Sequence, residues 1–471
     1  MAGDRSPKGP PSGRLGRTAR LGGLVAGQSA RWAGTRAANL VRTPERADAA
    51  TGERALALAH ELVEQLGQLR GAAMKVGQVL STLDFPGIPE EERESFKATL
   101  ASLRDDVPPL PFPKVRKLLE SELGERLGAA FSEFDEEAFA AASIGQVHRA
   151  VTADGRAVAV KIQYPGVAEA VETDLRNAAL LMPLVKRLAP GLDTKALYGE
   201  LRERIAEELD YEHEAQNQRA VARAFRGHPF AYVPAVDTAL STRRVLVSEL
   251  LEGRRFEEVK RLDEPARDRF GEIVFRFYFG LLAHLGRVCG DPHPGNYLLL
   301  ADGSVGFLDF GLMRSVDAAY LDGERAIAQA VVERDGDTVK EQLARLGYLP
   351  QPDSFEADAL LAQIEAAGAW YFEPGFRRLS PAYVSDVVER GGSPRSPWFE
   401  QMRHQTIPPQ ALLIRRMEGL VFTVLGELRA GADWNALATE FFAGEPAGTP
   451  LGDQDRAFWD GRRSTGRPAA A

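Results

Sequence analysis

The segment Val288-Cys289-Gly290-Asp291-Pro292-His293-Pro294-Gly295-Asn296 and the nearby Phe307-Leu308-Asp309-Phe310-Gly311 decide the fold of this chain. Between them, the apolar runs 297–300 and 305–308 flank Ala301-Asp302-Gly303-Ser304. Asp-Gly between two such runs is a strong short-range signal for a β-hairpin. The hairpin is expected to bring Asn296 and Asp309 back to the same end.

Three side chains in these two segments suit the chemistry of a phosphate site. Phosphoryl transfer requires a carboxylate near the attacking oxygen, and oxygen ligands that hold Mg²⁺ against the β- and γ-phosphates. Asp291 fits the first role, and Asn296 and Asp309 fit the second. Either segment alone could be a chance turn rich in Pro and Gly, but the two in this order indicate that the chain handles ATP.

Composition limits the other classes of function. The 471 residues exceed one typical core, so two or three packed units are expected. Apolar and charged contents of 44% and 27% are those of a soluble globular protein, and the net charge of -9 argues against nucleic acid as a partner. No secretory signal or membrane-spanning stretch is visible, which favours a cytoplasmic protein. The single cysteine, Cys289, excludes an internal disulfide, and a buried thiol is favoured over a redox role.

The first 46 residues form a basic arm in an otherwise acidic protein. They contain nine Arg or Lys against one Asp and one Glu, interleaved with apolar residues. Such an arm could lie on an anionic membrane surface or remain flexible. From Glu53 to Thr82 apolar residues recur at three- and four-residue steps, which predicts an amphipathic helix. Its last turns carry Lys75 and Gln78 on one face, where a solvated lysine is the simpler interpretation.

The pattern changes to β between Phe139 and Gln163. Two β-rich runs, 147–152 and 156–163, flank Ala153-Asp154-Gly155, and the second contains Val158-Ala159-Val160-Lys161. A Val-Ala-x-Lys strand is where a kinase keeps its phosphate-binding lysine. The preceding loop has alanines where glycines would bring the backbone closest to phosphate. Its residues, expected to contact the nucleotide, are Ala140, Ala141, Ala142, Ser143, Ile144, Gly145 and Gln146.

An acidic helix is expected over about Lys195 to Ala224. At about 100° per residue, Asp210 and Glu214 lie on one side and Glu208 on nearly the opposite side. Glu214 can face the Lys161 strand while Glu208 faces another partner, although a solvated acidic face is the usual interpretation of a charge run. The following run, 245–253, is predicted to be a buried strand entering a hinge turn, with Glu249 and Leu251 assigned to nucleotide binding.

The remainder of the chain is predicted to be mostly helical. After a long apolar helix at 270–285 and the Asp291 segment, no long polar activation segment follows Gly311, and helical patterning resumes by Tyr320. A platform for docking peptides is therefore not expected. Residues 372–409 are predicted to be an irregular insertion and the tail from Glu445 to be disordered.

Together, these motifs resemble the AarF/UbiB family of atypical kinases, which includes the mitochondrial kinase-like proteins of coenzyme Q biosynthesis. The resemblance spans about residues 53–435. The resemblance rests on four motifs: Lys75-x-Gly77-Gln78, the Ala-rich loop, Glu208-x-Asp210, and Asp291-Pro-His-Pro-Gly-Asn296 with Asp309-Phe-Gly. One departure is Cys289-Gly290, where the family commonly has His-Ala before the catalytic Asp.

The resemblance implies an α+β, two-lobe protein-kinase-like fold with an N-terminal helical extension. The expected divisions are the arm 1–50, the extension 51–130, a β-rich N-lobe 131–253, a helical C-lobe 254–444 and the tail 445–471. It also implies ATP (or ADP) and Mg²⁺ as cofactors, ATPase-like activity, and support of quinone or isoprenoid-lipid metabolism at a membrane. The Ala-rich loop, the helical extension and the missing peptide platform argue against phosphorylation of proteins in trans. By the same resemblance, Lys161 and Glu214 form an ion pair, Asp291 is catalytic, Asn296 and Asp309 hold metal, and Glu208 and Asp210 meet Lys75 and Gln78.

Two other functions remain open at this point. Gly290-Asp291 through Asn296 also resembles the catalytic loop of antibiotic phosphotransferases, although the Lys75 and Glu208 elements are not expected in such enzymes. A non-catalytic scaffold that senses nucleotide and recruits lipid-biosynthetic enzymes is the third possibility.

Overall fold

The computed structural model describes residues 42–66, 110–142, 144–188, 209–392 and 396–464, with isolated positions within 31–39, 88–100 and 194–206. The chain divides into two compact units. The first comprises residues up to Glu212 together with Ala239–Val247, and the second comprises His213–Thr238 and Ser248 onward. These limits differ from the expected lobe boundary at 253, because residues 213–238 belong with the second unit.

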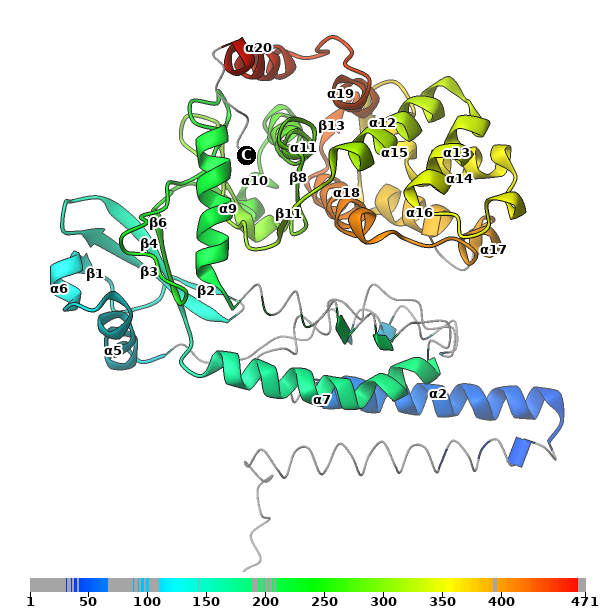
Figure 1. Ribbon diagram of the computed structural model, residues 1–471, viewed down its shortest axis with the longest axis horizontal. Helices are drawn as coiled ribbons and strands as arrows, with labels where there is room; N and C mark the ends of the chain where they lie inside the picture. The colour runs from blue at the N-terminus through cyan, green and yellow to red at the C-terminus, as the bar shows by residue number, and fades with distance from the viewer. Residues whose placement is uncertain are drawn as a thin grey trace, which may run out of the picture. The chain divides into compact units, whose positions relative to one another are not determined.

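The first unit is built on a mixed set of helices and one sheet (Figure 1). Its elements are α2 (Pro44–Leu66), α5 (Phe112–Leu123), α6 (Leu127–Ala130), β1 (Phe131–Phe134), β2 (Ala140–Ala142), β3 (Gly145–Thr152), β4 (Ala157–Gln163) and α7 (Val167–Leu188), and it shares α9 (Tyr211–Ala224) and β6 (Val245–Glu249) with the second unit. The strand order is β1-β3-β4-β6, with β2 also paired to β3. The expected hairpin is confirmed, since β3 and β4 are antiparallel and Lys161 lies opposite Val147.

Apolar alternation along the strands buries one face of this sheet. Val158, Val160 and Ile162 of β4 are nearly inaccessible, and they form a core with Val115 and Leu119 of α5. α5 begins after Pro111 and ends at Gly124, whose φ of 72° is the left-handed conformation that glycine adopts without penalty. α2 packs along α7 (Figure 1), burying its apolar stripe as an amphipathic helix requires.

The second unit is mostly helical with short strand pairs. Its elements are β5 (Ala231–Tyr232), β7 (Arg254–Arg255), α10 (Phe256–Val259), α11 (Glu264–Leu285), β8 (Arg287–Cys289), η1 (Pro294–Asn296), β9 (Tyr297–Leu299), β10 (Val305–Phe307), β11 (Met313–Ser315), α12 (Ala318–Glu333), α13 (Gly336–Leu346), η2 (Pro352–Ser354), α14 (Ala357–Ala367), α15 (Ala369–Phe372), β12 (Arg377–Arg378), α16 (Pro381–Gly392), α17 (Phe399–Met402), α18 (Pro409–Leu428), β13 (Gly431–Ala432), α19 (Trp434–Phe442) and α20 (Pro450–Ser464). Its larger sheet has the order β5-β10-β9-β7, and β8 pairs with β11.

The centre of this unit is α11, the expected apolar helix. Asp263 caps its first turn by accepting a hydrogen bond from the Ala266 amide, and Gly286 ends it with a φ of 60°. Residues of α11 are buried against α18, α19 and β8. Phe277 stacks on Phe307 of the predicted 297–308 hairpin, with ring centroids 3.6 Å apart. The hairpin is confirmed, and α11 is what anchors it.

Two expectations about the helices are wrong. The acidic helix is not continuous through 224, because Leu209 and Asp210 lie outside helix and α9 starts at Tyr211. Asp210 Oδ1 accepts a hydrogen bond from the Glu212 amide at 3.0 Å, so Asp210 acts as the cap that separates the segments. The angles expected between Asp210 and Glu214 on one regular helix therefore do not apply. Residues 372–409 are also more regular than expected, since they contain α16 and α17.

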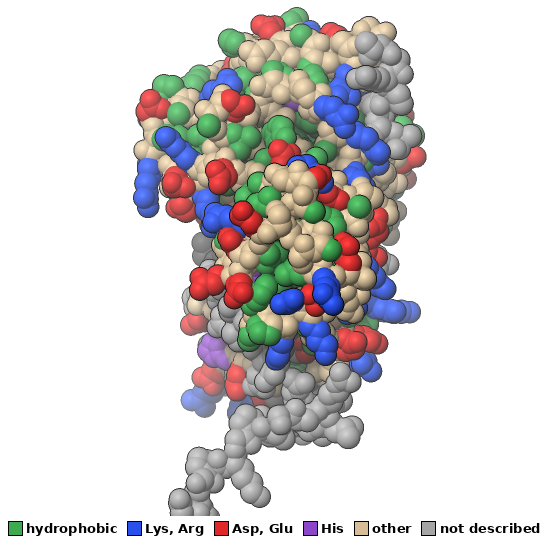
Figure 2. Space-filling model, turned by 90° about the vertical axis from the view of Figure 1, so that its left-hand side faces the viewer, with side chains coloured by type: hydrophobic (Ala, Val, Ile, Leu, Met, Phe, Trp, Pro, Cys, Tyr) green, Lys and Arg blue, Asp and Glu red, His purple; other side chains and the backbone are tan. Residues whose placement is uncertain are grey.

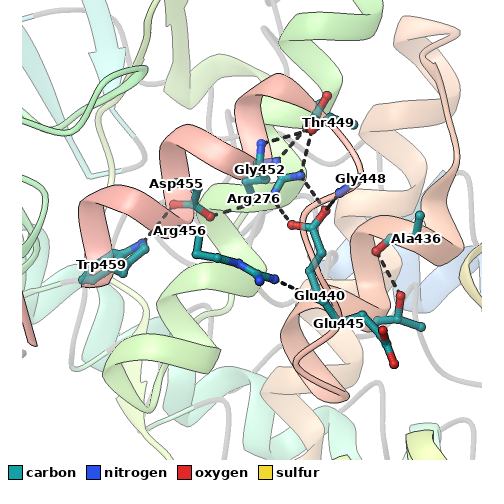
Figure 3. Close-up of polar contacts among 12 residues, drawn as sticks. Arg276, Ala436, Glu440, Glu445, Gly448, Thr449, Gly452, Asp455, Arg456 and Trp459 are labelled. Carbon is teal, nitrogen blue, oxygen red and sulfur yellow. Dashed lines mark hydrogen bonds and ion pairs between the residues drawn. The ribbon is translucent and has the colours of Figure 1, made fainter. Parts of the chain in front are cut away.

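The predicted disorder of the tail is also wrong for residues 445–464, which include α20. Figure 3 shows why this helix is held: Arg276 of α11, 2% exposed, donates to both carboxylate oxygens of Glu440 and to the Thr449 hydroxyl. Asp455 of α20 lies 3.8 Å from the same guanidinium and accepts from the Trp459 indole. A buried guanidinium needs such partners, so α20 completes the unit although its sequence is polar.

Within the described ranges, none of the helices combines the length and apolar character that a membrane crossing requires. On the face drawn in Figure 2, basic and acidic side chains are interspersed. The basic arm, residues 1–46, lies almost wholly outside the described residues.

Candidate functional site

The candidate catalytic loop, residues 290–296, lies between two strand pairs of the second unit, β8 with β11 and β9 with β10. Cys289 at the end of β8 pairs with Met313 of β11, and the Gly290 amide donates to the Leu312 carbonyl at 2.8 Å. After the loop, the single turn η1 leads into β9, and the Leu308 amide donates to the Asn296 carbonyl at 3.1 Å. The backbone of the hairpin thus places Asn296 and the residue before Asp309 side by side, as the sequence predicted.

Local hydrogen bonds fix the shape of the loop. The His293 ring accepts from the Gly295 amide through Nδ1 at 3.0 Å, and the Asn296 amide donates to the His293 carbonyl. The side-chain nitrogen of Asn296 lies 3.5 Å from the Asp291 carbonyl, which leaves its Oδ1 as the atom suited to a metal. These contacts give His293 and Gly295 of the motif a structural task.

The donor set at this end of the hairpin fits Mg²⁺ bound together with a nucleotide. Among the described residues, His, Cys, Asp and Glu do not gather in groups of three that could form an all-protein metal site. Mg²⁺ in nucleotide sites is usually held by one or two protein oxygens, with phosphates and water completing an octahedron. Asp309 and Asn296 supply one carboxylate and one amide oxygen, which matches that requirement.

Helix α9 braces the Asp309-Phe310-Gly311 segment. Asp309 Oδ1 accepts from the Gly311 amide at 3.0 Å, and Asn217 of α9 donates to the Phe310 carbonyl at 3.1 Å. A Cβ at Gly311 would lie 3.8 Å from the Glu214 carboxylate, so the 5% exposed Glu214 sits directly beside this glycine. The expected helical glutamate therefore lies beside the Asp309-Phe310-Gly311 segment.

Arg416 of α18 is a site residue that the sequence did not reveal. Its Nε donates to the Gly290 carbonyl at 2.7 Å, and its Nη2 lies 3.4 Å from Asp291 Oδ1. The guanidinium thus holds both the backbone and the carboxylate of the catalytic loop. No local motif marks it, because it lies 125 residues further along the chain.

Gly290 and Cys289, the departure from the family pattern, have packing explanations. A Cβ at Gly290 would lie 2.8 Å from Leu413 Cδ2 and 3.0 Å from Leu312 Cδ2, so an alanine here would require these leucine side chains to shift. Cys289 is buried, and burial raises the pKa of its thiol to about 12. The thiol stays protonated at neutral pH, which agrees with the structural interpretation rather than a redox role.

In the first unit, Lys161 lies on β4 with its ammonium 4.8 Å from the centre of the Tyr211 ring. The Ala-rich segment forms β2 and the turn into β3, with Ala142 opposite Gly145. Gly145 is required there, because a Cβ would lie 2.1 Å from the Ile162 carbonyl oxygen. Ile144 is buried, and its carbonyl accepts from the Tyr164 amide. The other residues of the segment, Ala140, Ala141 and Ala142, remain partly or fully exposed.

Two residues assigned to nucleotide binding have structural side chains. Gln146 is 1% exposed, and its Oε1 accepts from the Leu110 amide at 2.6 Å, which ties the segment before α5 to the sheet. Glu249 accepts from the Tyr232 hydroxyl at 2.7 and 2.8 Å, and burial together with this carboxylate raises the pKa of Tyr232 to about 12. Any contact of these two residues with nucleotide is therefore expected through their backbone.

The remaining predicted site residues are distributed as follows. Leu251 packs against Gly306 of β10, since a Cβ on that glycine would lie 2.8 Å from Leu251 Cδ1. Asp210 lies 3.8 Å from the Arg243 guanidinium on an exposed surface. Four residues lie outside the described part of the chain: Lys75, Gln78, Ser143 and Glu208.

Comparisons with known proteins agree with these features. The ABC1 atypical kinase-like domain matches residues 102–343. The mitochondrial atypical kinase COQ8B of Rattus norvegicus is 34% identical over 310 residues, which cover 65% of this chain and 57% of the relative. The chloroplastic protein ACTIVITY OF BC1 COMPLEX KINASE 8 of Arabidopsis thaliana is 32% identical over 302 residues, covering 62% and 39%. The chain therefore spans less than two thirds of the length of either relative.

A solved structure is similar over most of the chain. The complex of Rv3197 with erythromycin from Mycobacterium tuberculosis superimposes with a TM-score of 0.62 and 33% identity, covering 84% of this chain and 98% of that one. The fold is thus α+β and kinase-like, with a β-rich and a helical lobe. Because the ABC1 atypical kinase-like domain matches more than half of this chain, the chain belongs to the ABC1, or AarF/UbiB, family of atypical kinases.

Proposed function

We propose that this protein is an atypical kinase or ATPase that binds ATP with Mg²⁺ and supports quinone or isoprenoid-lipid metabolism. The observation that carries the proposal is the assembly of the second unit's site. Asp291 and Asn296 share one short loop, and α9 braces the segment that carries Asp309. This set provides a carboxylate for the attacking oxygen and oxygen ligands for the metal, which phosphoryl transfer requires.

Each residue has a distinct role in this proposal. Mg²⁺, when bound by Asn296 and Asp309, would neutralise charge on the β- and γ-phosphates. Asp291 accepts a proton from the attacking group, and Arg416 holds its carboxylate in position. Lys161 and Glu214 pair when nucleotide is bound, and the backbone of the Ala-rich segment covers the phosphates.

The acceptor is proposed to be something other than a protein in trans. Only residues 312–317 separate Gly311 from α12, and β11 occupies half of that interval, so there is little chain for a peptide-docking platform. The COQ8B relative supports a link to quinone biosynthesis. We place the activity in the cytoplasm, peripheral to the inner face of the membrane through the basic arm. Removing residues 1–46 should abolish flotation with anionic liposomes, and unchanged flotation would refute the attachment.

The extension motif is proposed to restrict the acceptor position. Lys75 and Gln78 would then meet Glu208 and Asp210, as the family resemblance implies. On this view Lys75→Ala changes nucleotide preference or exposes phosphotransfer activity, measured by ATP and ADP titrations and autophosphorylation. Kinetics equal to those of the wild type would leave the extension with a structural role alone.

The decisive test is nucleotide-dependent thermal stability. A ligand that binds only the folded state stabilises it by about 2.7 kcal/mol at 100 times its Kd. ATP with Mg²⁺ should therefore raise Tm in the wild type, and Asp309→Asn should lose the Mg²⁺-dependent part. Asp353→Asn, the same change on an exposed turn, should respond as the wild type does. No shift at saturating nucleotide would sink the proposal.

The catalytic role can be separated from a scaffold role in cells. A deletion strain complemented with Asp291→Ala should show the quinone or lipid profile of the deletion if turnover is required. A wild-type profile would favour the scaffold that recruits lipid-biosynthetic enzymes. Screening amino-alcohol antibiotics as phosphate acceptors tests the small-molecule phosphotransferase alternative.

A second candidate function is macrolide binding, which the erythromycin complex of the similar solved structure supports. Titration calorimetry with erythromycin, with and without ATP and Mg²⁺, measures it directly. Absence of heat under both conditions would remove this candidate while leaving the nucleotide site untouched.

A further inference from the structure

The helical part of the second unit encloses a cavity that the kinase-like site does not use. Its volume is about 370 Å³, within the range of small-molecule sites, and residues of α12, α13, α14, α16 and α18 contribute to its wall. Most of the lining is apolar or aromatic. This apolar and aromatic lining includes Ile327, Leu343, Leu360, Trp370, Tyr371 and Phe422. Trp370 and Phe422 are themselves stacked, with centroids 4.9 Å apart, and form a rigid aromatic wall.

One end of the cavity carries a concentrated set of charges. Arg415 of α18 donates to Glu418 at 2.7 Å and is also bonded to Glu324 of α12. The Tyr348 hydroxyl donates to Glu324 at 2.7 Å and lies 3.3 Å from Arg415 Nε. The Arg415 side chain is still 37% exposed, as expected for a group that faces an open cavity. Polar groups this organised beside an aromatic wall are typical of a site for an amphipathic ligand.

The charge at this end is unbalanced. The lining contains two carboxylates, Glu324 and Glu418, and one guanidinium, Arg415, which gives a formal charge of one negative unit. Burial favours protonation of Glu324, but Arg415 and the Tyr348 and Tyr320 hydroxyls together lower its pKa. For Glu418, burial outweighs Arg415 and raises the pKa. Glu418 is therefore the carboxylate whose charge is least compensated.

We propose that this cavity binds an amphipathic amine, with its apolar body against Trp370 and Phe422 and its ammonium beside Glu418. Within the described residues, Arg415 meets Glu418 through Oε2, so Oε1 is the atom that remains for a ligand. An ammonium restores charge balance, whereas a carboxylate or phosphate would add a second uncompensated negative charge beside the mostly buried Glu324 and Glu418. A neutral ligand fills the same space but does not restore the charge balance, so it is expected to bind more weakly than the amine.

The cavity opens beside α16 and α18. Val388 of α16 is 59% exposed, and Gly419 of α18 lies on the wall next to Glu418. A Cβ at Gly419 would meet no atom within 4 Å, so a larger side chain can be placed there without a backbone clash. Because glycine within a helix is about 1 kcal/mol less favourable than alanine, substitutions at this position should not impair folding.

Binding of 4-phenylbutylamine to the full chain, measured by titration calorimetry, tests the proposal. The matched probes are 4-phenyl-1-butanol and 4-phenylbutyrate, which keep the apolar body and change only the head group. We expect one amine bound per chain, the alcohol at least tenfold weaker, and the acid weaker still. Glu418→Gln should lower the affinity for the amine at least tenfold and leave the affinity for the alcohol unchanged.

Three further variants control the experiment. Gly419→Phe should block all three probes, while Gly419→Ala should bind as the wild type does. Glu400→Gln removes an exposed carboxylate from α17 and should have no effect. The proposal is overturned if the wild type binds no amine, if it binds the acid as well as the amine, or if Gly419→Phe binds normally. Asp309→Asn should bind the amine normally, so the proposal for this cavity and the proposal for the nucleotide site can be tested independently.

Discussion

Arg416 illustrates how one side chain can set the geometry of a catalytic loop without belonging to its motif. Its guanidinium reaches the Gly290 carbonyl and the Asp291 carboxylate from a helix more than 100 residues away in sequence. A charged hydrogen bond of this kind orients the carboxylate to which our proposal gives the role of proton acceptor. In that proposal Arg416 is a positioning residue that acts through Asp291.

We expect Arg416→Met to lower kcat for ATP turnover by about 10-fold to 100-fold, the range seen when groups that orient a catalytic residue are removed. KM for ATP should change little, because Arg416 contacts the loop rather than the nucleotide. Steady-state ATPase kinetics measure both constants. Arg403→Met, at an exposed arginine paired with Glu400, is the control and should resemble the wild type. An increase in KM at constant kcat would contradict the positioning role.

Gly290 gives a second prediction at the residue scale. Gly290→Ala should destabilise the protein by about 1–3 kcal/mol, because its methyl group would crowd Leu413 and Leu312. The cost should be smaller in a Leu413→Ala background, and urea unfolding of the four proteins in this cycle measures the difference. Gly128→Ala, where a Cβ meets nothing within 4 Å, is the control. Equal costs in both backgrounds would exclude Leu413 as the cause.

At the scale of elements, α20 matters because it covers titratable and charged groups of α11. His284 of α11 stacks on Trp459 of α20, with ring centroids 4.5 Å apart. Burial lowers the pKa of His284 to about 4, well below the ordinary histidine value near 6.5. In the folded state His284 is thus neutral at pH 5, whereas in the unfolded chain it is mostly protonated.

This difference predicts a loss of stability in mild acid. Below about pH 6.5 the unfolded state binds the additional proton, so the free energy of unfolding falls as the pH decreases toward 4. Between pH 7.5 and 5 the contribution of His284 is about 2 kcal/mol. His284→Phe keeps the stacked ring and should remove that part of the pH dependence in urea melts. His404→Phe, at an exposed position, should not.

Elements also differ in how well the sequence predicts them. Both hairpins and α11 were predicted because an Asp-Gly turn and an apolar period are local signals. The break at Asp210 was missed because Asp210 lies in a run of acidic residues, and the sequence does not distinguish an aspartate that caps a helix from one inside a helix. The tail α20 was missed because its helix is stabilised by Arg276 and His228, which are distant in sequence.

At the scale of the whole molecule, the two units are not separable at the lobe boundary that the sequence suggests. Residues 213–238 contribute β5 and much of α9 to the second unit. Val221, Phe225 and Phe230 lie in the same core as Phe277 of α11. A fragment that begins at 254 would lose these buried side chains together with Glu214 and Asn217.

We therefore expect a fragment of residues 213–471 to unfold cooperatively and a fragment of residues 254–471 not to do so. Near-ultraviolet circular dichroism and urea titration distinguish the two, because fixed aromatic packing and a sharp transition accompany an intact core. Equal cooperativity of the two fragments would show that α9 and β5 are dispensable to the second unit.

The sequence by itself determined the family, the α+β kinase-like fold, the two hairpins and the candidate roles of Asp291, Asn296 and Asp309. These follow from turn chemistry and from residues close together along the chain, where hydrogen bonds and side-chain period are local. Only the tertiary structure decided that Arg416 holds Asp291, that Leu413 of α18 packs closely on Gly290, that α20 closes over α11, and that an unbalanced charge lines the C-terminal cavity. Each of these depends on side chains brought together from distant segments, whose packing no local pattern records.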